Sequence, residues 1–205
     1  MSVLVLAATV VFAVVILSGS DSVDKSAAGS TSTTTYQPGP QSIDKAGKYK
    51  PGKVTNACYA VDLPAIARLG YPAKGEPVHE ETDTGTGGSL ECSADFENAS
   101  FAGQANFDWD SDNSLFEESK ARAIAAPPAD TTAAAIAGLG ESAYYTMADR
   151  SGANRTDIEV KVEAKDSNLF VRITFRVSGF DIQADREAVR QAAEFQAHTM
   201  LVRLR

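Results

Sequence analysis

A chain of 205 residues with 43% hydrophobic content is long enough for one folded domain flanked by additional segments. Its formal net charge of −8 argues against a nucleic-acid-binding protein, because phosphate contacts need a basic stripe and the sequence has none. The same acidic balance argues against simple electrostatic attraction to an anionic membrane surface.

The chain begins with an apolar run, Val3–Leu17, that contains no charged residue. In helical geometry this run reaches roughly 22 Å, which is short of the ~30 Å hydrocarbon core of a bilayer. That length suits the apolar region of a signal peptide, although the usual preceding positive charges are missing. Residues 1–20 are therefore predicted to be a signal peptide cleaved near Ser20 or a retained membrane anchor. Either fate places the rest of the chain on the extracytoplasmic side, attached to the membrane or secreted.

A polar segment follows at residues 21–53, rich in Ser, Thr, Gly and Pro and including the tract Ser30–Thr35. Such a composition buries too little apolar surface to offset the entropy lost on ordering. The segment is predicted to be a disordered linker that connects the leader to a folded domain at 54–205.

The two cysteines of the chain, Cys58 and Cys92, both fall in the predicted domain. In an oxidising compartment an isolated pair is most simply a disulfide, which would stabilise this fold by roughly 3–4 kcal/mol. A metal pair or a reactive thiol is the alternative. Two cysteines without a nearby histidine do not complete a tetrahedral metal site.

The predicted domain opens with a short helix at Leu63–Leu69. Pro64 fits its first turn, and Gly70 is a typical stop signal. Residues 72–88 are predicted to be a polar loop. Its end, Thr84–Ser89, superficially resembles a phosphate-binding loop but lacks the Gly-Lys-Ser/Thr ending, so a turn is expected and no cofactor is predicted.

Alternation of apolar and polar residues predicts the next two strands, at 90–96 and 104–109. A helix at 115–126 follows. The pair Ser114 and Glu117 matches a capping box at its beginning.

The second half of the domain is predicted to contain three strands and a terminal helix. A strand at 143–147 precedes two strongly alternating runs, 156–164 and 169–177, which indicate an antiparallel hairpin. A helix at 185–204 has an apolar stripe. The stripe comprises Val189, Ala193, Gln196, Ala197, Met200 and Leu204.

These elements follow one another in the order α-β-β-α-β-β-β-α. The predicted fold is therefore α+β, with an antiparallel sheet of about five strands and helices packed on one face.

Four pieces of the sequence together carry a family resemblance: Cys58, Leu69-Gly70, Cys92 and the segment Leu139–Tyr144. With these pieces the chain resembles a family of actinobacterial cell-envelope lipoproteins of unknown function, over about residues 54–205. The resemblance implies an envelope location and a small α+β domain, and it carries over no catalytic residues. This chain departs from the family in having Ser20 where the lipidated cysteine belongs, so no lipid is predicted there.

The sharpest candidate metal site is formed by Asp108, Asp110 and Asp112. Carboxylates at alternate positions resemble the first half of a calcium-binding loop. The sixth position is Asn113 instead of Gly, and the twelfth is Ser119 instead of Glu. A strand end leading into a capped helix is the favoured interpretation, and no metal is predicted.

An acidic group surrounds His79 and is a weaker candidate for a metal site or a general acid–base pair. Its members are Glu76, Glu80, Glu81 and Asp83. A solvated loop is the favoured interpretation. His198 lies far away in the sequence, on the terminal helix, and is expected to be an ordinary surface side chain.

Three aromatic residues, Trp109, Tyr144 and Tyr145, are candidates for an apolar or glycan-binding groove, with core packing as the favoured role. No nucleophile motif such as Gly-x-Ser-x-Gly is present.

The sequence therefore favours a non-catalytic binding or scaffold module of the bacterial cell envelope, in contact with the membrane through its N-terminal segment. Its expected partner is an envelope protein, a lipid or a glycan. An exported hydrolase with a dispersed site and a lipid or small-molecule carrier are the alternatives. A large cavity between the sheet and the terminal helix would favour the carrier, whereas a filled core would favour a protein partner.

Overall fold

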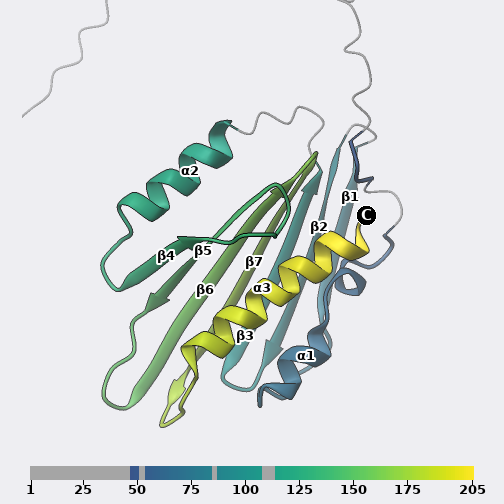
Figure 1. The fold of residues 1–205 in the computed structure, drawn as a ribbon. Helices are drawn as coiled ribbons and strands as arrows, with labels where there is room; N and C mark the ends of the chain where they lie inside the picture. Colours follow the sequence, from purple (N-terminus) through teal and green to yellow (C-terminus); the bar gives the residue numbers. More distant parts are fainter. Residues whose placement is uncertain (1–46, 51–53, 85–86, 108–113) are drawn as a thin grey trace, which may run out of the picture. The chain divides into compact units, whose positions relative to one another are not determined.

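The computed structural model describes residues 47–50, 54–84, 87–107 and 114–205. They form a seven-stranded antiparallel sheet in the order β1-β2-β3-β7-β6-β5-β4 (Figure 1). The helical elements are η2 (Ala57–Ala60), α1 (Leu63–Arg68), α2 (Ser114–Ala125) and α3 (Arg186–Arg203). The strands are β1 (Val78–Asp83), β2 (Gly88–Phe96), β3 (Ala99–Phe107), β4 (Thr131–Ala135), β5 (Ser142–Asp149), β6 (Arg155–Asp166) and β7 (Leu169–Phe180).

The centre of the sheet is the β6–β7 hairpin, and its prediction from alternation is confirmed. Successive side chains of a strand point to opposite faces, so every second residue of β7 is buried. Those buried residues are Leu169, Val171, Ile173, Phe175 and Val177. We call the face that they share the packed face, and the opposite one the open face.

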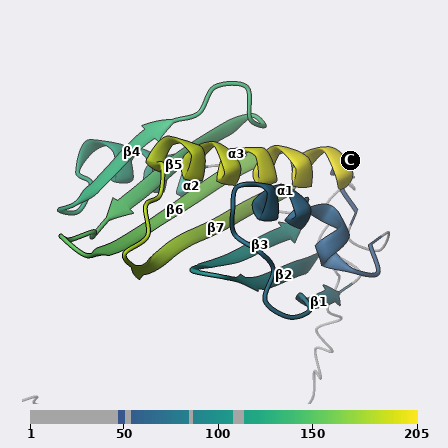
Figure 2. The ribbon, with the colours of Figure 1, turned by 90° about the horizontal axis from the view of Figure 1, so that it is seen from below.

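Helix α3 covers the packed face across β6 and β7 (Figures 1 and 2). It begins where the sequence predicts, because the Asp185 carboxylate accepts hydrogen bonds from the N–H groups of Glu187 and Ala188. The predicted apolar stripe is confirmed. All of its residues, from Val189 to Leu204, are buried against the sheet.

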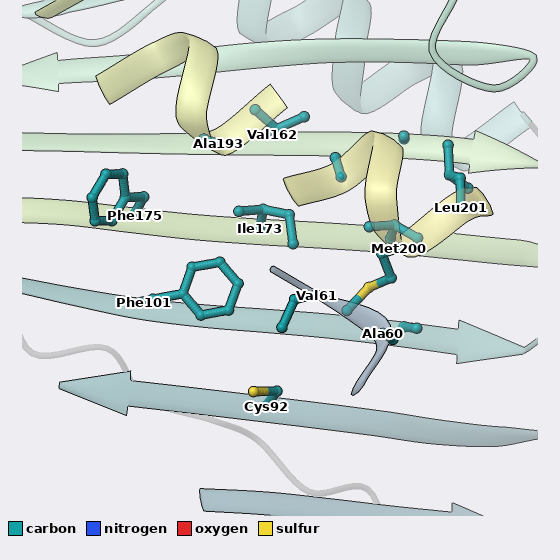
Figure 3. Close-up of a cluster of buried hydrophobic side chains, with 14 of the residues drawn as sticks. Ala60, Val61, Cys92, Phe101, Val162, Ile173, Phe175, Ala193, Met200 and Leu201 are labelled. Carbon is teal, nitrogen blue, oxygen red and sulfur yellow. The ribbon is translucent and has the colours of Figure 1, made fainter. Parts of the chain in front are cut away.

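The space between α3 and the sheet is filled by side chains. Figure 3 shows Phe101 of β3 beside Ile173 and Phe175 of β7. A Cβ atom added at Gly103 would lie 3.2 Å from Met200 Cε and 3.3 Å from Ile173 Cδ1. Because even one methyl group is crowded there, the interior at this point holds no ligand-sized cavity.

The predicted sheet of about five strands is wrong, because β1 and β4 extend it at its two edges. Strand β1 lies inside the predicted loop 72–88, and its sequence, Val-His-Glu-Glu-Thr-Asp, shows no buried face. Strand β4 consists of two threonines and three alanines, and alanine is a poor strand former. Both strands owe their conformation to pairing with a neighbouring strand. The pattern of apolar residues within one strand does not reveal such pairing.

The predicted placement of all helices on one face is also wrong, because α2 lies on the open face. Its Phe116 ring contacts Tyr144 and Phe170 at centroid distances of 5.8 and 6.0 Å, and both partners point to the open face. Lys120 Nζ donates a 2.7 Å hydrogen bond to Ser142 Oγ on the same face. The sheet therefore has helices on both faces.

Cys58 and Cys92 form a disulfide that ties η2 to β2. Cys92 is buried on the packed face, so the bond attaches the segment before α1 to the interior of the sheet. Gly70 adopts a φ of +94° just after α1, which is the left-handed conformation that favours glycine at a helix end.

The segment Gly47–Lys50, which we call the strap, packs on the turn between β6 and β7, although the sequence placed it in the linker. Tyr49 is fully buried. Its N–H donates to Asn168 Oδ1 at 3.0 Å, and its C=O accepts from Asn168 Nδ2 at 2.9 Å. The Tyr49 hydroxyl donates to Asp166, which also lies 2.7 Å from Lys48 Nζ.

No helix within the described ranges is both long and apolar enough to cross a bilayer. The predicted leader, residues 1–20, lies outside those ranges.

Candidate functional site

The open face of the sheet carries a hollow of about 280 Å³ over β1, β2, β3 and β7. Its floor is a row of short side chains that lie opposite one another across the four strands. In register these are Val78, Ser93, Ala102 and Thr174. The hollow exists because a serine, an alanine and a threonine occupy successive positions of one cross-strand row.

A row of long polar side chains runs along one side of this floor. It consists of Glu80, Glu91, Gln104 and Arg172, again in register from β1 to β7. Gln104 Nε2 donates to Glu91 Oε1 at 2.5 Å, which holds both side chains along the hollow. The wall therefore offers carboxylates near β1 and a guanidinium at β7.

Arg172 is held in place by contacts on β6 and β7. Its Nε donates to Glu163 Oε1 at 2.6 Å, and its guanidinium lies 5.3 Å from the centre of the Phe170 ring. The second oxygen of Glu163 accepts a hydrogen bond from the Tyr144 hydroxyl. Burial and the neighbouring Glu163 carboxylate raise the pKa of Tyr144, so this hydroxyl stays protonated and acts as a donor.

Beyond the hollow, the open face carries a series of ion pairs on β6 and β7. Arg176 donates from Nε and Nη2 to the two oxygens of Asp157, each at 3.0 Å. Lys161 Nζ lies 2.9 Å from Glu159 Oε1. Because these charges are paired with one another, they provide a fixed polar surface.

Strand β1 separates the acidic residues that the sequence grouped around His79. The predicted loop is wrong here, since alternation along the strand sends Glu80 to the open face and His79 and Glu81 to the other side. His79 Nδ1 lies 2.9 Å from Glu81 Oε1, and the same Glu81 oxygen accepts from the N–H of Ala57 at 2.5 Å. Within the described residues no three acidic, histidine or cysteine side chains gather in a metal-binding group.

His198 belongs to a different part of the molecule. It lies on the exposed side of α3, beside a hollow of about 320 Å³ that is also lined by Tyr49, Asp166 and Arg205. His79 lies on β1 at the edge of the sheet, where its ring is paired with Glu81 on the side opposite Glu80. The two histidines therefore do not share a site.

The candidate aromatic groove is not formed by Tyr144 and Tyr145, because neighbours in a strand point to opposite faces; Tyr144 is buried, in line with the favoured packing role. Tyr144 lies under α2 on the open face. The Tyr145 ring lies on the packed side, with the Arg190 guanidinium 5.1 Å from its centre. Trp109 and the candidate calcium ligands Asp108, Asp110 and Asp112 lie outside the described residues.

A larger hollow, of about 540 Å³, lies at the far end of the sheet from the strap. It is lined mainly by two connections, residues 151–154 and 181–184, together with the adjoining ends of β6 and α3. Arg186 at its margin is paired with Asp149. Its walls are loops, so we regard the smaller hollow on the rigid sheet as the better candidate site.

Sequence reasoning missed the residues of this candidate site. Ser93, Ala102 and Thr174 look like ordinary solvent-facing strand residues when each strand is considered alone. Only the register between strands, which brings positions 78 and 174 into one row, shows that short side chains adjoin one another.

Comparison with known proteins adds no relative: no protein-family profile matches the chain, and no curated protein resembles it significantly in sequence. The candidate site is therefore interpreted from its own geometry. A shallow hollow with a small-residue floor and a polar wall is suited to receiving a side chain or short segment of a partner.

Proposed function

We propose that this protein is a non-catalytic binding or scaffold module of the bacterial cell envelope, exported and then tethered to the membrane or secreted. Its partner is an envelope protein, which it contacts through the open-face hollow. The apolar leader and the Cys58–Cys92 disulfide support an extracytoplasmic location. The resemblance of residues 54–205 to envelope lipoproteins supports the same placement.

The observation that carries this proposal is the row of short side chains in the middle of an otherwise polar face. Ser93 and Ala102 are exposed, and Val78 at the end of the row is 68% exposed. An exposed valine beside small residues gives a partner apolar surface to bury, and the flanking Arg172 and Glu91 fix its orientation.

A protein partner fits the structure better than a carried lipid. Carrying a lipid requires an internal cavity. The space between the sheet and α3, where such a cavity would be expected, is occupied by Phe101, Ile173 and Met200 (Figure 3). A shallow surface hollow leaves most of a lipid chain in water, whereas it accepts one protruding side chain of another protein.

The exported hydrolase has less support than the binding module. Its expected acid–base groups are divided between β1, where the His79 ring is paired with Glu81, and the hollow beside His198 on α3. The Tyr144 hydroxyl, which lies on the same face of the sheet as the candidate site, donates its hydrogen bond to Glu163. In the part of the chain that the structure describes, the His79 ring is paired with the Glu81 carboxylate and not with a serine or threonine hydroxyl.

Affinity capture from envelope extracts tests the proposal when it is combined with Ala102→Tyr, which fills the hollow with a large side chain. The matched control is Ala121→Tyr on the exposed side of α2. We expect the unaltered protein and the control to recover the same envelope protein, and Ala102→Tyr to lose it by about tenfold or more. Equal recovery by all three proteins, or recovery of no envelope protein, would contradict the proposal.

A further inference from the structure

The two edges of the sheet differ in how they are protected. Strand β1 carries Glu80, Glu81 and Asp83, and edge charges of this kind discourage pairing with another strand. Strand β4 has the sequence Thr-Thr-Ala-Ala-Ala, without a charge, a proline or a large side chain. The charges of β1 therefore oppose pairing with a further strand, whereas no side chain of β4 opposes it.

The pairing between β4 and β5 shows which backbone groups of β4 point outward. Asp149 N–H donates to Asp130 C=O at 2.8 Å, and Ile136 N–H donates to Ala143 C=O at 3.0 Å. Hydrogen-bonded and non-hydrogen-bonded pairs alternate along an antiparallel ladder. The even-numbered residues of β4 thus bond to β5, and the odd-numbered ones direct their N–H and C=O groups away from the sheet.

Three outward-pointing residues make up this edge: Thr131, Ala133 and Ala135. The Thr131 N–H is used in a turn, where it donates to Pro128 C=O at 3.1 Å. The described residues provide no partner for the Thr131 C=O or for the N–H and C=O groups of Ala133 and Ala135. Thr132 and Ala135 are exposed, and Thr131, Ala133 and Ala134 are half-buried, so the strand is partly accessible to solvent.

We propose that β4 pairs with β4 of a second copy of this chain, antiparallel and around a two-fold axis at Ala133. The two Ala133 residues then exchange a reciprocal pair of hydrogen bonds. Each Ala135 N–H donates to the Thr131 C=O of the other copy, which leaves the Thr131 turn intact. The result is one continuous sheet that joins the two domains through this edge.

A second copy fits this edge because the pairing is self-complementary. In the proposed register Thr131 lies opposite Ala135, and Thr132 lies opposite Ala134, so no charges meet and no large side chains clash. The same operation at β1 would place Glu81 opposite Glu81, and like charges directly opposite destabilise a strand pair. The sequence of β4 therefore permits self-pairing that the sequence of β1 opposes.

Helix α2 gives a second reason to expect a partner at this edge. It packs on β4 and β5, yet none of its residues is buried, and its Leu115 is 72% exposed. A two-fold axis perpendicular to the sheet places the second α2 on the same face of the joined sheet. The dimer thus provides additional surface beside the least buried helix of the fold.

The mass of the purified full chain, measured by sedimentation equilibrium in density-matched detergent, tests this proposal together with Ala133→Pro. Proline removes the outward N–H of Ala133 and leaves the β4–β5 ladder intact, because that N–H does not bond to β5. We expect the unaltered chain to have twice the mass of a monomer and Ala133→Pro to be monomeric. Ala137→Pro, outside the strand, is the matched control and is expected to remain dimeric.

A conservative cysteine variant keeps the test decisive if the proline variant does not fold. Residues opposite each other in a hydrogen-bonded pair have Cα atoms about 5.5 Å apart, within the roughly 4.4–6.8 Å that a disulfide spans. Under mild oxidation Ala133→Cys is expected to form covalent dimers, and Ala137→Cys is not. A monomeric unaltered chain, a dimer that persists in folded Ala133→Pro, or equal cross-linking at both positions would overturn the proposal. Loss of envelope-protein capture would not, because that result concerns the open-face hollow.

Discussion

The two faces of the sheet use the same strands in different ways. On the packed face, Ile173 and Phe175 of β7 are almost completely buried beneath α3. On the open face, the residues that alternate with them, Arg172 and Arg176, are paired with carboxylates of β6. The packed face depends on close contact, and the open face depends on polar pairs that are partly in water.

This difference means that the packed face determines the stability of the fold, whereas the open face is available to bind a partner. Close packing makes almost every change of volume costly, so the packed face has little freedom to vary. Exposed ion pairs contribute little to the free energy of unfolding, so side chains of the open face can be selected for a partner. The prediction that follows is a steep contrast between substitutions on the two faces of one strand.

The largest effect is expected for Phe175→Ala on the packed face. Removing this buried ring should lower the free energy of unfolding by about 3–5 kcal/mol, measured by urea denaturation. The matched control is Phe180→Ala on the same strand, whose ring is 74% exposed. We expect the control to change stability by less than about 0.5 kcal/mol. Similar losses for the two variants would refute the division between the faces.

An intermediate effect is expected at Asp166, a carboxylate at the end of the packed face. Burial by itself raises the pKa of Asp166, but hydrogen bonds from Lys48 and Tyr49 and the charges of Lys48 and Arg205 outweigh it and lower the pKa below its ordinary value of 3.8. Burial and the same contact with Asp166 raise the pKa of Tyr49 to about 12, so its hydroxyl remains a donor at neutral pH. Asp166→Asn should cost about 1–3 kcal/mol at pH 7.

The lowered pKa of Asp166 fixes the sign of its pH dependence. The folded state favours the ionised carboxylate, so its contribution is complete above the unfolded pKa and is lost as pH falls through the folded pKa. Urea midpoints of the unaltered protein and Asp166→Asn should therefore converge below about pH 4. A gap between the two proteins that stayed constant down to pH 2 would show that the strap does not depend on the Asp166 charge.

The smallest effect is expected for Glu91→Ala on the open face. Glu91 is exposed and its hydrogen bond to Gln104 lies in water, so the free energy of unfolding should change by less than about 0.5 kcal/mol. Under the proposed function, the same variant should still weaken capture of the envelope protein. Destabilisation by more than about 1 kcal/mol would mean that the polar wall supports the fold and not only recognition.

The sequence predicts the parts of the fold that have strong periodicity of their own. The β6–β7 hairpin follows from period-two alternation, and α3 follows from its apolar stripe. The pairing of Cys58 with Cys92 follows from cysteine number and the expected compartment. In each case the signal lies within one element or one pair of residues.

The remaining features depend on neighbours that are distant in the sequence. Strands β1 and β4 lack a periodic apolar side and become strands only through pairing. Helix α2 reaches the open face through contacts of Phe116 with β5 and β7, which its own sequence does not specify. The hollow likewise requires the register of four strands, so none of its floor residues was distinguishable in the sequence.

The disulfide between η2 and β2 also decides how a mechanical pull on the N-terminal side travels through the domain. Tension applied ahead of the strap first meets the bonds between Tyr49 and Asn168, at the turn of the central hairpin. Once these release, the tension reaches Cys58 and passes through the covalent bond directly into β2. Helix α1 and strand β1 lie in the loop between the two sulfur atoms, so they are bypassed and keep their places under load.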